Sequence, residues 1–429
     1  MPTVYLSKKL LLLGWLLVGG CVLLLQTGCE MANRVRLRYA NDAIVPVWPQ
    51  NRTEQQFQAL YIGEKPYIRI QVHTVAQQQA ELLMLIDTGA SVSLLFDSHK
   101  VQQLNLPKGY LLPLGGWGDG QDSQAWQTEV AALKLGEVHF HDVSLAYLPV
   151  AQSPYFLRPD ELVYDGVLGH DILRHFSWTF NPQQRLITAS VLPYQPTPED
   201  IQLALRESFS KISVPVTLHF NQQQLTLEVM LDTGSRHYLK LNSALLDSED
   251  IRLPAQQITA ADFGLSGRVV HQRVSVPQLQ LGTLAMGPLP ANVIPSDDED
   301  DWNIVGSALL NQHVSTIDYH SMRLYLRPVP GAPFRALYNL AGLEMRKLQN
   351  GNFVIRYLFP DLPAAKTNLK EGDIIQRING KSAVNYSEDD WLLLNNQPQQ
   401  LELCTAQQCA GFQTKQIAGY SVPALEPSP

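Results

Sequence analysis

The tripeptide Asp-Thr-Gly occurs twice in this chain, at Asp87-Thr88-Gly89 and at Asp232-Thr233-Gly234, with the aspartates 145 residues apart. Two carboxyl groups held about 3 Å apart cannot both ionise easily, so they share one proton over a broad pH range. The ionised member can then take a proton from a water molecule, while the protonated member polarises a carbonyl group. The glycines permit a sharp backbone turn beneath each carboxylate. This chemistry is hydrolysis that requires neither a metal ion nor a covalent intermediate.

Each tripeptide ends a pair of strand-like segments joined by a Gln-rich turn. The pairs are 67–72 with 82–86, and 214–220 with 227–231. Further along, each copy has an apolar pair, a glycine and a second apolar pair. These later elements are Val167-Leu168-Gly169 with Ile172-Leu173, and Ile304-Val305-Gly306 with Leu309-Leu310. The shared order and spacing indicate a duplication. Short alternating strands between turns predict a mainly β structure, built as small barrels or sandwiches.

From about Glu64 to Pro328, this arrangement resembles the retropepsin-like aspartic proteases. That family places Asp-Thr-Gly on a loop backed by an apolar-apolar-Gly element, and takes one carboxylate from each of two lobes. The resemblance implies that Asp87 and Asp232 form a catalytic dyad within one chain. It also implies that Thr88 and Thr233 bond to the opposite loop and lock the lobes together. The alternative is that two chains pair through their first lobes and that the second lobe is structural.

The two copies differ after the tripeptide. Ala90 follows the first, whereas Ser235 follows the second and could donate a hydrogen bond to Asp232. A cation from Arg236 near Asp232 would favour the ionised form of that carboxyl. We therefore expect Asp232 to be the charged partner and Asp87 to be the protonated one.

The resemblance also predicts flexible flaps over the substrate. The segment 114–120 is rich in glycine and carries one aromatic residue, which suits a mobile hairpin tip, and 263–267 holds the corresponding place in the second copy. The candidate flap residues are Gly116, Trp117, Gly118, Phe263 and Gly264. Ordinary glycine loops are the alternative. The acidic run 297–301 is more typical of a solvated loop than of a site.

A second resemblance begins after the Pro- and Gly-rich break at 330–333. Residues 359–380 contain Pro-Ala-Ala, Leu-x-x-Gly-Asp and Asn-Gly elements and look like a bacterial PDZ domain, with the match covering about 337–417. Such domains bind an extended peptide as an added strand. By position, Ala341, Gly342 and Leu343 would receive the carboxylate of that peptide. The alternative is a PDZ fold that only packs against the protease lobes.

The N-terminus has the layout of an export signal. Lys8 and Lys9 precede an apolar stretch at 10–25, and the step to Cys29 resembles a bacterial lipoprotein box. Cys29 is the expected lipidation site, with Cys21 as a second candidate and an uncleaved signal anchor as the alternative. Glu30 favours the outer membrane over the inner one. We expect a lipoprotein of the cell envelope that faces the periplasm.

Charge and cysteine content limit the other possibilities. The 429 residues include 32 Lys+Arg and 40 Asp+Glu, a net charge of −8, which argues against a nucleic-acid binder. Cys404 and Cys409 are plausible disulfide partners in an oxidising compartment, with two free thiols as the alternative. His and Cys residues do not have the spacing of metal ligands, so we expect no metal and no cofactor.

The sequence therefore predicts a mainly β fold, with two tandem retropepsin-like barrel lobes forming a pseudo-dimer and a small α+β PDZ domain. The expected boundaries are a leader at 1–29, a tether at 30–56, lobes at 57–195 and 205–329, and the PDZ domain at 335–418. The expected activity is that of an exported, membrane-tethered aspartic endopeptidase acting on peptides or proteins. Its PDZ domain would bind peptide or regulate substrate access. The alternative is a non-catalytic peptide-binding scaffold acting through that domain.

Overall fold

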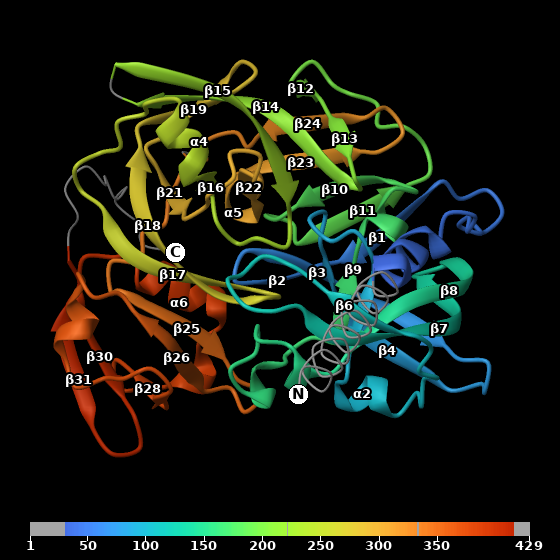
Figure 1. Cartoon of the computed structure of the whole chain (residues 1–429), viewed down its shortest axis with the longest axis horizontal. Coiled ribbons are helices and arrows are strands. Elements are labelled where there is room, and N and C mark those ends of the chain that lie inside the picture. Colours follow the sequence, from blue (N-terminus) through green and yellow to red (C-terminus); the bar gives the residue numbers. More distant parts are fainter. Residues whose placement is uncertain (1–30, 221, 333, 416–429) are drawn as a thin grey trace, which may run out of the picture.

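The computed structural model describes residues 31–220, 222–332 and 334–415. It contains two β-rich lobes and a smaller C-terminal domain. In Figure 1 the first lobe lies at the lower right, the second at the top, and the C-terminal domain, in orange and red, at the lower left. The leader and both candidate lipidation sites, Cys21 and Cys29, lie outside the described residues. Within the described part, no helix is long and apolar enough to cross a membrane.

The first lobe is an eight-stranded sheet in the order β2-β3-β4-β9-β5-β8-β7-β6, and further pairing of β3 with β7 closes it into a barrel. Its elements are β2 (Leu60–Ile62), β3 (Lys65–His73), β4 (Gln79–Ile86), β5 (Leu94–Phe96), α2 (His99–Gln102), β6 (Leu111–Leu114), β7 (Ser123–Leu135), β8 (Val138–Leu148), η1 (Val150–Gln152), η2 (Pro159–Glu161), β9 (Gly166–Leu168) and α3 (His170–Leu173). Alternation along β3 points Ile68, Ile70 and Val72 into the core.

The second lobe repeats this order along β14-β15-β22-β16-β21-β18-β17. Its elements are β13 (Arg206–Ser208), β14 (Lys211–Phe220), β15 (Gln223–Asp232), β16 (Leu239–Asn242), α4 (Ser243–Ser248), β17 (Ile258–Gly264), β18 (Gly267–Val276), β19 (Gln278–Leu281), β20 (Leu284–Met286), β21 (Leu289–Ile294), β22 (Ile304–Gly306) and α5 (Ser307–Leu310). The duplication seen in the sequence is therefore a repeat of one strand topology.

A six-stranded sheet joins the lobes, in the order β1-β11-β10-β23-β24-β12. Its strands are β1 (Glu54–Gln58), β10 (Ser177–Asn181), β11 (Leu186–Ser190), β12 (Ile201–Ala204), β23 (His313–Asp318) and β24 (Arg323–Pro328). Equivalent strands meet at its centre, where the hydroxyls of Thr179 and Thr316 are 2.8 Å apart. One continuous hydrophobic core runs through both lobes. The pseudo-dimer is thus fused into a single packed body.

The segment expected to be a tether is instead packed against the first lobe. A helix covers residues 31–40, and its Leu37 is buried. The buried Asn41 donates from Nδ2 to Asp171 Oδ2 at 2.8 Å. The first part of this segment is therefore held against the barrel wall by one apolar side chain and one amide.

The C-terminal domain has two small sheets, one α-helix and two short 3-10 helices. A three-stranded sheet contains β25 (Leu343–Lys347), β26 (Phe353–Leu358) and β27 (Ile374–Ile375), and a four-stranded sheet contains β28 (Arg377–Ile378), β29 (Lys381–Ser382), β30 (Gln400–Cys404) and β31 (Cys409–Gln413). The helices are η3 (Pro363–Lys366), η4 (Ala383–Asn385) and α6 (Glu388–Leu394). A reciprocal cap between Ser387 and Asp390 starts α6 and directs Trp391 into the domain's core. The predicted mainly β fold, with two tandem lobes and this domain, is confirmed.

Candidate active site

Each Asp-Thr-Gly triplet lies at the end of a strand that is paired with a parallel neighbour. Ile86 of β4 lies opposite Leu168 of β9, and the Asp87 N–H donates to the Leu168 carbonyl at 3.0 Å. In the second lobe, Asp232 at the end of β15 lies opposite Gly306 of β22. The apolar-apolar-Gly elements therefore form the neighbouring strands that fix where each triplet begins.

The two threonines bond across the lobe boundary with matching geometry. Thr88 Oγ1 donates to the Leu231 carbonyl at 2.7 Å and accepts from the Thr233 N–H at 3.1 Å. Thr233 Oγ1 donates to the Ile86 carbonyl at 2.7 Å and accepts from the Thr88 N–H at 3.1 Å. All four bonds are buried, and they hold the two triplets in register.

The carboxyl groups of Asp87 and Asp232 meet at this boundary, where the charge of Asp232 acts on Asp87. Each carboxyl also lies against the glycine of the opposite triplet. A Cβ added to Gly89 would lie 2.6 Å from Asp232 Cγ, and one added to Gly234 would lie 2.4 Å from Asp87 Cγ. Only glycine permits this close approach. The fold therefore brings the two sequence-predicted aspartates into one site within a single chain.

The two carboxyls have different surroundings. Burial and then the charge of Asp232 raise the pKa of Asp87 from 3.8 to about 7. Asp87 accepts one backbone N–H, from Gly89 at 2.8 Å. Asp232 accepts two, from Gly234 at 2.9 Å and from Ser235 at 3.1 Å. Because backbone donors stabilise a carboxylate, this asymmetry favours the proton on Asp87 and the negative charge on Asp232.

Neither side chain that was expected to cause this asymmetry contacts Asp232. The Ser235 hydroxyl is buried without a hydrogen-bond partner in the described structure, and the Ser235 backbone N–H bonds to Asp232 instead. Arg236 forms a buried ion pair with Glu344 of the C-terminal domain. The backbone turn after Gly234 points the Arg236 side chain out of the site, so sequence proximity to Asp232 was misleading.

The two predicted flaps meet each other over the site. The first is the loop between β6 and β7 with Gly116, Trp117 and Gly118, and the second is the tip of the β17–β18 hairpin after Phe263 and Gly264. The Gly120 N–H donates to the Ser266 carbonyl at 2.7 Å, and the Ser266 N–H donates to the Trp117 carbonyl at 3.0 Å. The flap tips are therefore joined backbone to backbone.

Comparison with protein families gives the same division of the chain. Residues 73–172 and 214–309 match the aspartyl protease family, and residues 339–404 match the PDZ domain family. The chain carries two tandem retropepsin-like aspartyl protease domains and a PDZ domain. No curated protein matches it as a relative.

The PDZ domain packs directly on the second protease flap. The Arg356 guanidinium of β26 lies 3.7 Å from the centre of the Phe263 ring. The Thr259 N–H of β17 donates to Asp361 Oδ2 at 3.1 Å. Figure 1 shows β17 running beside the PDZ domain toward the middle of the molecule. Opening of the second flap must therefore either break these contacts or move the PDZ domain together with the flap.

The residues predicted to bind a peptide carboxylate lie next to this interface. Ala341 and Leu343 are buried. The Gly342 and Leu343 N–H groups donate to the Asn339 side-chain oxygen, at 3.0 and 3.2 Å. Beside them, Glu344 of β25 pairs with Arg236 of the second lobe. In this arrangement the amides that a peptide carboxylate would use are bonded within the domain.

Two lysines near the dyad were missed by the sequence analysis. Lys211 donates from Nζ to the Gly89 carbonyl of the first triplet. The buried Lys240 lies 3.6 Å from the centre of the Trp117 ring on the first flap, and the charges of Asp262 and then Asp232 act on it. Lys211 and Lys65 begin the equivalent strands β14 and β3, but this repeat does not show which of the two lysines reaches a triplet.

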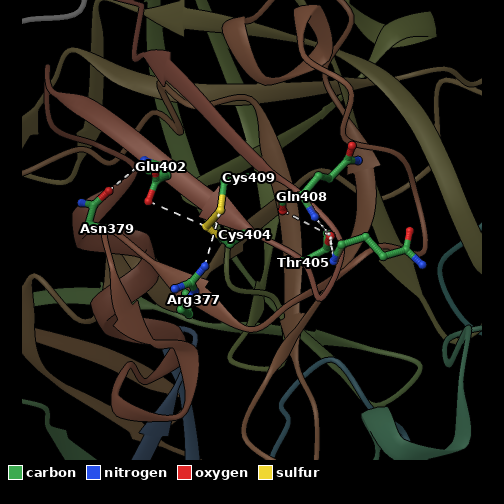
Figure 2. The surroundings of a disulfide bond; sticks show 8 residues. Arg377, Asn379, Glu402, Cys404, Thr405, Gln408 and Cys409 are labelled. Atoms are coloured by element: carbon green, nitrogen blue, oxygen red, sulfur yellow. Dashed lines mark hydrogen bonds between the residues drawn. A yellow bond between two sulfur atoms is a disulfide. The ribbon is translucent and has the colours of Figure 1, made fainter.

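The two remaining cysteines form a disulfide, as Figure 2 shows. Cys404 and Cys409 lie opposite each other on β30 and β31, with Cα atoms 4.0 Å apart. With Glu402 they make a cluster of metal-ligand type, but the two sulfurs are bonded to each other. The disulfide therefore closes the last hairpin of the PDZ domain.

Proposed function

We propose that this chain is an aspartic endopeptidase in which Asp87 and Asp232 activate one water molecule. The observation that carries the proposal is the pair of adjoining carboxyls, one from each lobe, held by reciprocal threonine bonds. A scaffold with no catalytic role requires neither the half-buried carboxyl pair nor the glycines against which it packs.

In the proposed mechanism the carboxylate of Asp232 takes a proton from the water, whose oxygen attacks the peptide carbonyl carbon. Asp87 donates its proton to the carbonyl oxygen, giving a neutral tetrahedral diol. Return of a proton to the peptide nitrogen then permits cleavage of the C–N bond. The single backbone donor to Asp87 and the two to Asp232 support this division of roles.

The test is cleavage of reduced, alkylated casein across pH 3 to 8. Asp87→Asn and Asp232→Asn should each abolish cleavage. The matched controls Asp142→Asn and Asp250→Asn replace exposed aspartates, one in each lobe, at positive-φ positions that asparagine tolerates. Full activity of Asp232→Asn would contradict the intramolecular dyad and point to pairing of first lobes between chains. Inactive wild-type enzyme at every pH would favour the peptide-binding scaffold.

The proposal includes export and membrane attachment through Cys29. Its support is the basic and apolar leader in the sequence, followed at once by the helix of residues 31–40 that packs on the first lobe. An outer-membrane lipoprotein facing the periplasm is the proposed location. Labelling with a radioactive fatty acid should fail in Cys29→Ser and persist in Cys21→Ser; the reverse pattern would contradict the assignment.

We also include regulation of substrate access by the PDZ domain. Its contacts with β17 hold the second flap, and the exposed pair Arg268–Glu371, 3.0 Å apart, joins the PDZ domain to β18, the other strand of the same hairpin. Arg268→Glu should push the PDZ domain from the flap and raise kcat/KM for casein several-fold. Arg252→Glu, an exposed charge reversal elsewhere on the second lobe, is the control. Unchanged or lower activity of Arg268→Glu would contradict regulation by this contact.

A PDZ domain that binds peptide remains part of the proposal. Because the Gly342 and Leu343 amides are bonded to Asn339, peptide binding requires this loop to rearrange. Peptides with free C-termini should therefore bind more tightly to Asn339→Ala than to the wild-type chain. Equal affinity of the two chains would argue against carboxylate capture at this loop.

A further inference from the structure

A lysine ammonium group lies beside the dyad, contributed by the second lobe to the first. Lys211 begins β14, directly after the two-residue turn formed by Phe209 and Ser210, and pairs with Ser208. Its Nζ donates to the carbonyl of Gly89, whose own N–H donates to Asp87 Oδ1 at 2.8 Å. One glycine therefore connects the ammonium group with the carboxyl.

The charge of Lys211 acts on both members of the dyad. Desolvation lowers the pKa of Lys211, and the charges of Asp87 and then Asp232 oppose that effect. In turn, the ammonium charge works against the burial and the Asp232 charge that raise the pKa of Asp87. The lysine and the two aspartates thus form one electrostatic group across the lobe boundary.

The corresponding lysine of the first lobe is used differently. Lys65 also begins its strand after a two-residue turn, but its Nζ lies 3.3 Å from the hydroxyl oxygen of Tyr155 and not on the backbone of a catalytic loop. The hairpin therefore does not require a lysine to reach the catalytic loop. Of these two equivalent lysines, one bonds to the backbone of a triplet and the other does not.

We propose that Lys211 is a positioning residue that fixes the Gly89 carbonyl and shifts the pH range of hydrolysis toward acid. A cation beside the dyad stabilises each deprotonated form, so both ionisations of the pair occur at lower pH than they would without it. The singly protonated pair, which does the chemistry, is then populated in a more acidic interval. This inference rests on the proposed protease function.

Other ionisable groups lie near the dyad and Lys211, and they also influence the pH dependence of the site. Around the dyad, Tyr164 and Tyr319 are affected by the charge of Asp87, and Lys240 is affected by the charge of Asp232. Around Lys211, Arg38 and His170 are the neighbouring basic groups, and His170 Nε2 lies 3.3 Å from Glu207 Oε1. All of them are retained in the variants below.

The experiment measures kcat/KM against pH for the full chain on a peptide substrate. Lys211→Met and Lys211→Gln remove the charge, and Gln keeps an amide donor that can reach the Gly89 carbonyl. Both limbs of the profile should move upward by about one pH unit in each variant, because an adjacent cation typically shifts a carboxyl by that amount or more. Lys211→Arg should keep the limbs in place, and so should Lys65→Met.

A fall in kcat/KM with both limbs unmoved would overturn the proposal and leave Lys211 with a structural role. If the wild-type chain cleaves no substrate, the proposed function fails and the lysine is still tested by carboxyl ¹³C NMR of the full chain. The Asp87 resonance should then titrate at higher pH in Lys211→Gln than in wild type; equal titration would overturn the inference. If Lys211→Met does not fold, Lys211→Gln alone is compared with the wild-type chain.

Discussion

The two lobes agree at the threonines and glycines and differ in the other groups that bond to each aspartate and its loop. Each threonine hydroxyl donates at 2.7 Å and accepts at 3.1 Å, so the cross-lobe lock is symmetric. By contrast, Asp87 has one backbone donor and Lys211 on its loop, whereas Asp232 has two backbone donors. The duplication has retained the frame of the site and let the environments of its two acids diverge.

The same division extends to the flaps. The first flap loop, residues 115–122, is rich in glycine, whereas the second is a tight turn of Leu265 and Ser266 between paired strands. Among the described residues, the flap strands that bond to the PDZ domain are β17 and β18 of the second flap. After the triplet, the second lobe also sends Arg236 to Glu344 of the PDZ domain. Both lobes contact the PDZ domain, the first through bonds such as that from Arg356 to the Tyr155 carbonyl, but the comparison teaches that the flap strands in contact with it belong to the second lobe.

The largest effect should come from filling the space between the lobes. Gly89→Ala and Gly234→Ala each place a Cβ within 2.6 Å of the opposite carboxyl carbon, so that carboxyl must move. A shift of about 1 Å in a catalytic group costs on the order of 100-fold in rate. We expect both variants to lose at least that much kcat/KM on casein.

Gly411→Ala is the matched control, because its nearest neighbour would be 3.6 Å from the added carbon. Equal losses in the two catalytic variants would show that both lobes supply the site equally. A variant that retained full activity would break the comparison, since the opposite lobe, whose carboxyl the added Cβ displaces, could not then hold one of the two reacting carboxyls.

The repeated strand pairs, the two triplets and the C-terminal PDZ pattern were enough to predict the mainly β fold and its three units. These features are short sequence patterns, and they are easier to recognise because the duplication repeats the strand pairs and the triplets. The meeting of Asp87 with Asp232 came from the family resemblance rather than from spacing, because a separation of 145 residues carries no distance information.

The contacts that could not be predicted from the sequence depend on which groups the ends of long side chains reach in the folded chain. Lys211 acts on the opposite lobe, through the backbone carbonyl of Gly89, so the sequence around either residue gives no sign of the contact. Arg236 was assigned to Asp232 on sequence proximity, but the backbone turn directs it to Glu344, which lies 108 positions away. The burial of Leu37 could not be predicted for a similar reason, since it depends on a barrel built from residues much later in the chain.

The second prediction concerns the dependence of stability on pH. The folded pKa of Asp87, about 7, lies above its ordinary value of 3.8, so the folded chain holds this proton more tightly than the unfolded chain. The stabilising contribution is fully present below about pH 4 and is lost as pH rises toward 7, a change of up to about 4 kcal/mol. Asp87→Asn lacks this titration and should gain stability relative to wild type over that interval.

Urea denaturation followed by tryptophan fluorescence at pH 4, 5.5 and 7.5 measures this difference. Asp142→Asn, on the surface of the same lobe, should track the wild type at every pH. Parallel curves for Asp87→Asn and wild type would mean that Asp87 does not retain the proton, and the assignment of acid and base to the two lobes would have to be abandoned.

The smallest effect should come from exchanging the residues after the triplets. The buried Ser235 hydroxyl has no partner in the described structure, and the bond to Asp232 comes from the Ser235 backbone, which every residue but proline provides. Ser235→Ala should therefore change kcat/KM by less than about threefold, because it removes no hydrogen bond that is made in the folded chain. Ala90→Ser is its counterpart in the first lobe. A loss of tenfold or more in Ser235→Ala, with Ala90→Ser unaffected, would mean that the hydroxyl turns to Asp232 during catalysis, and the asymmetry between the acids would then arise partly from a side chain.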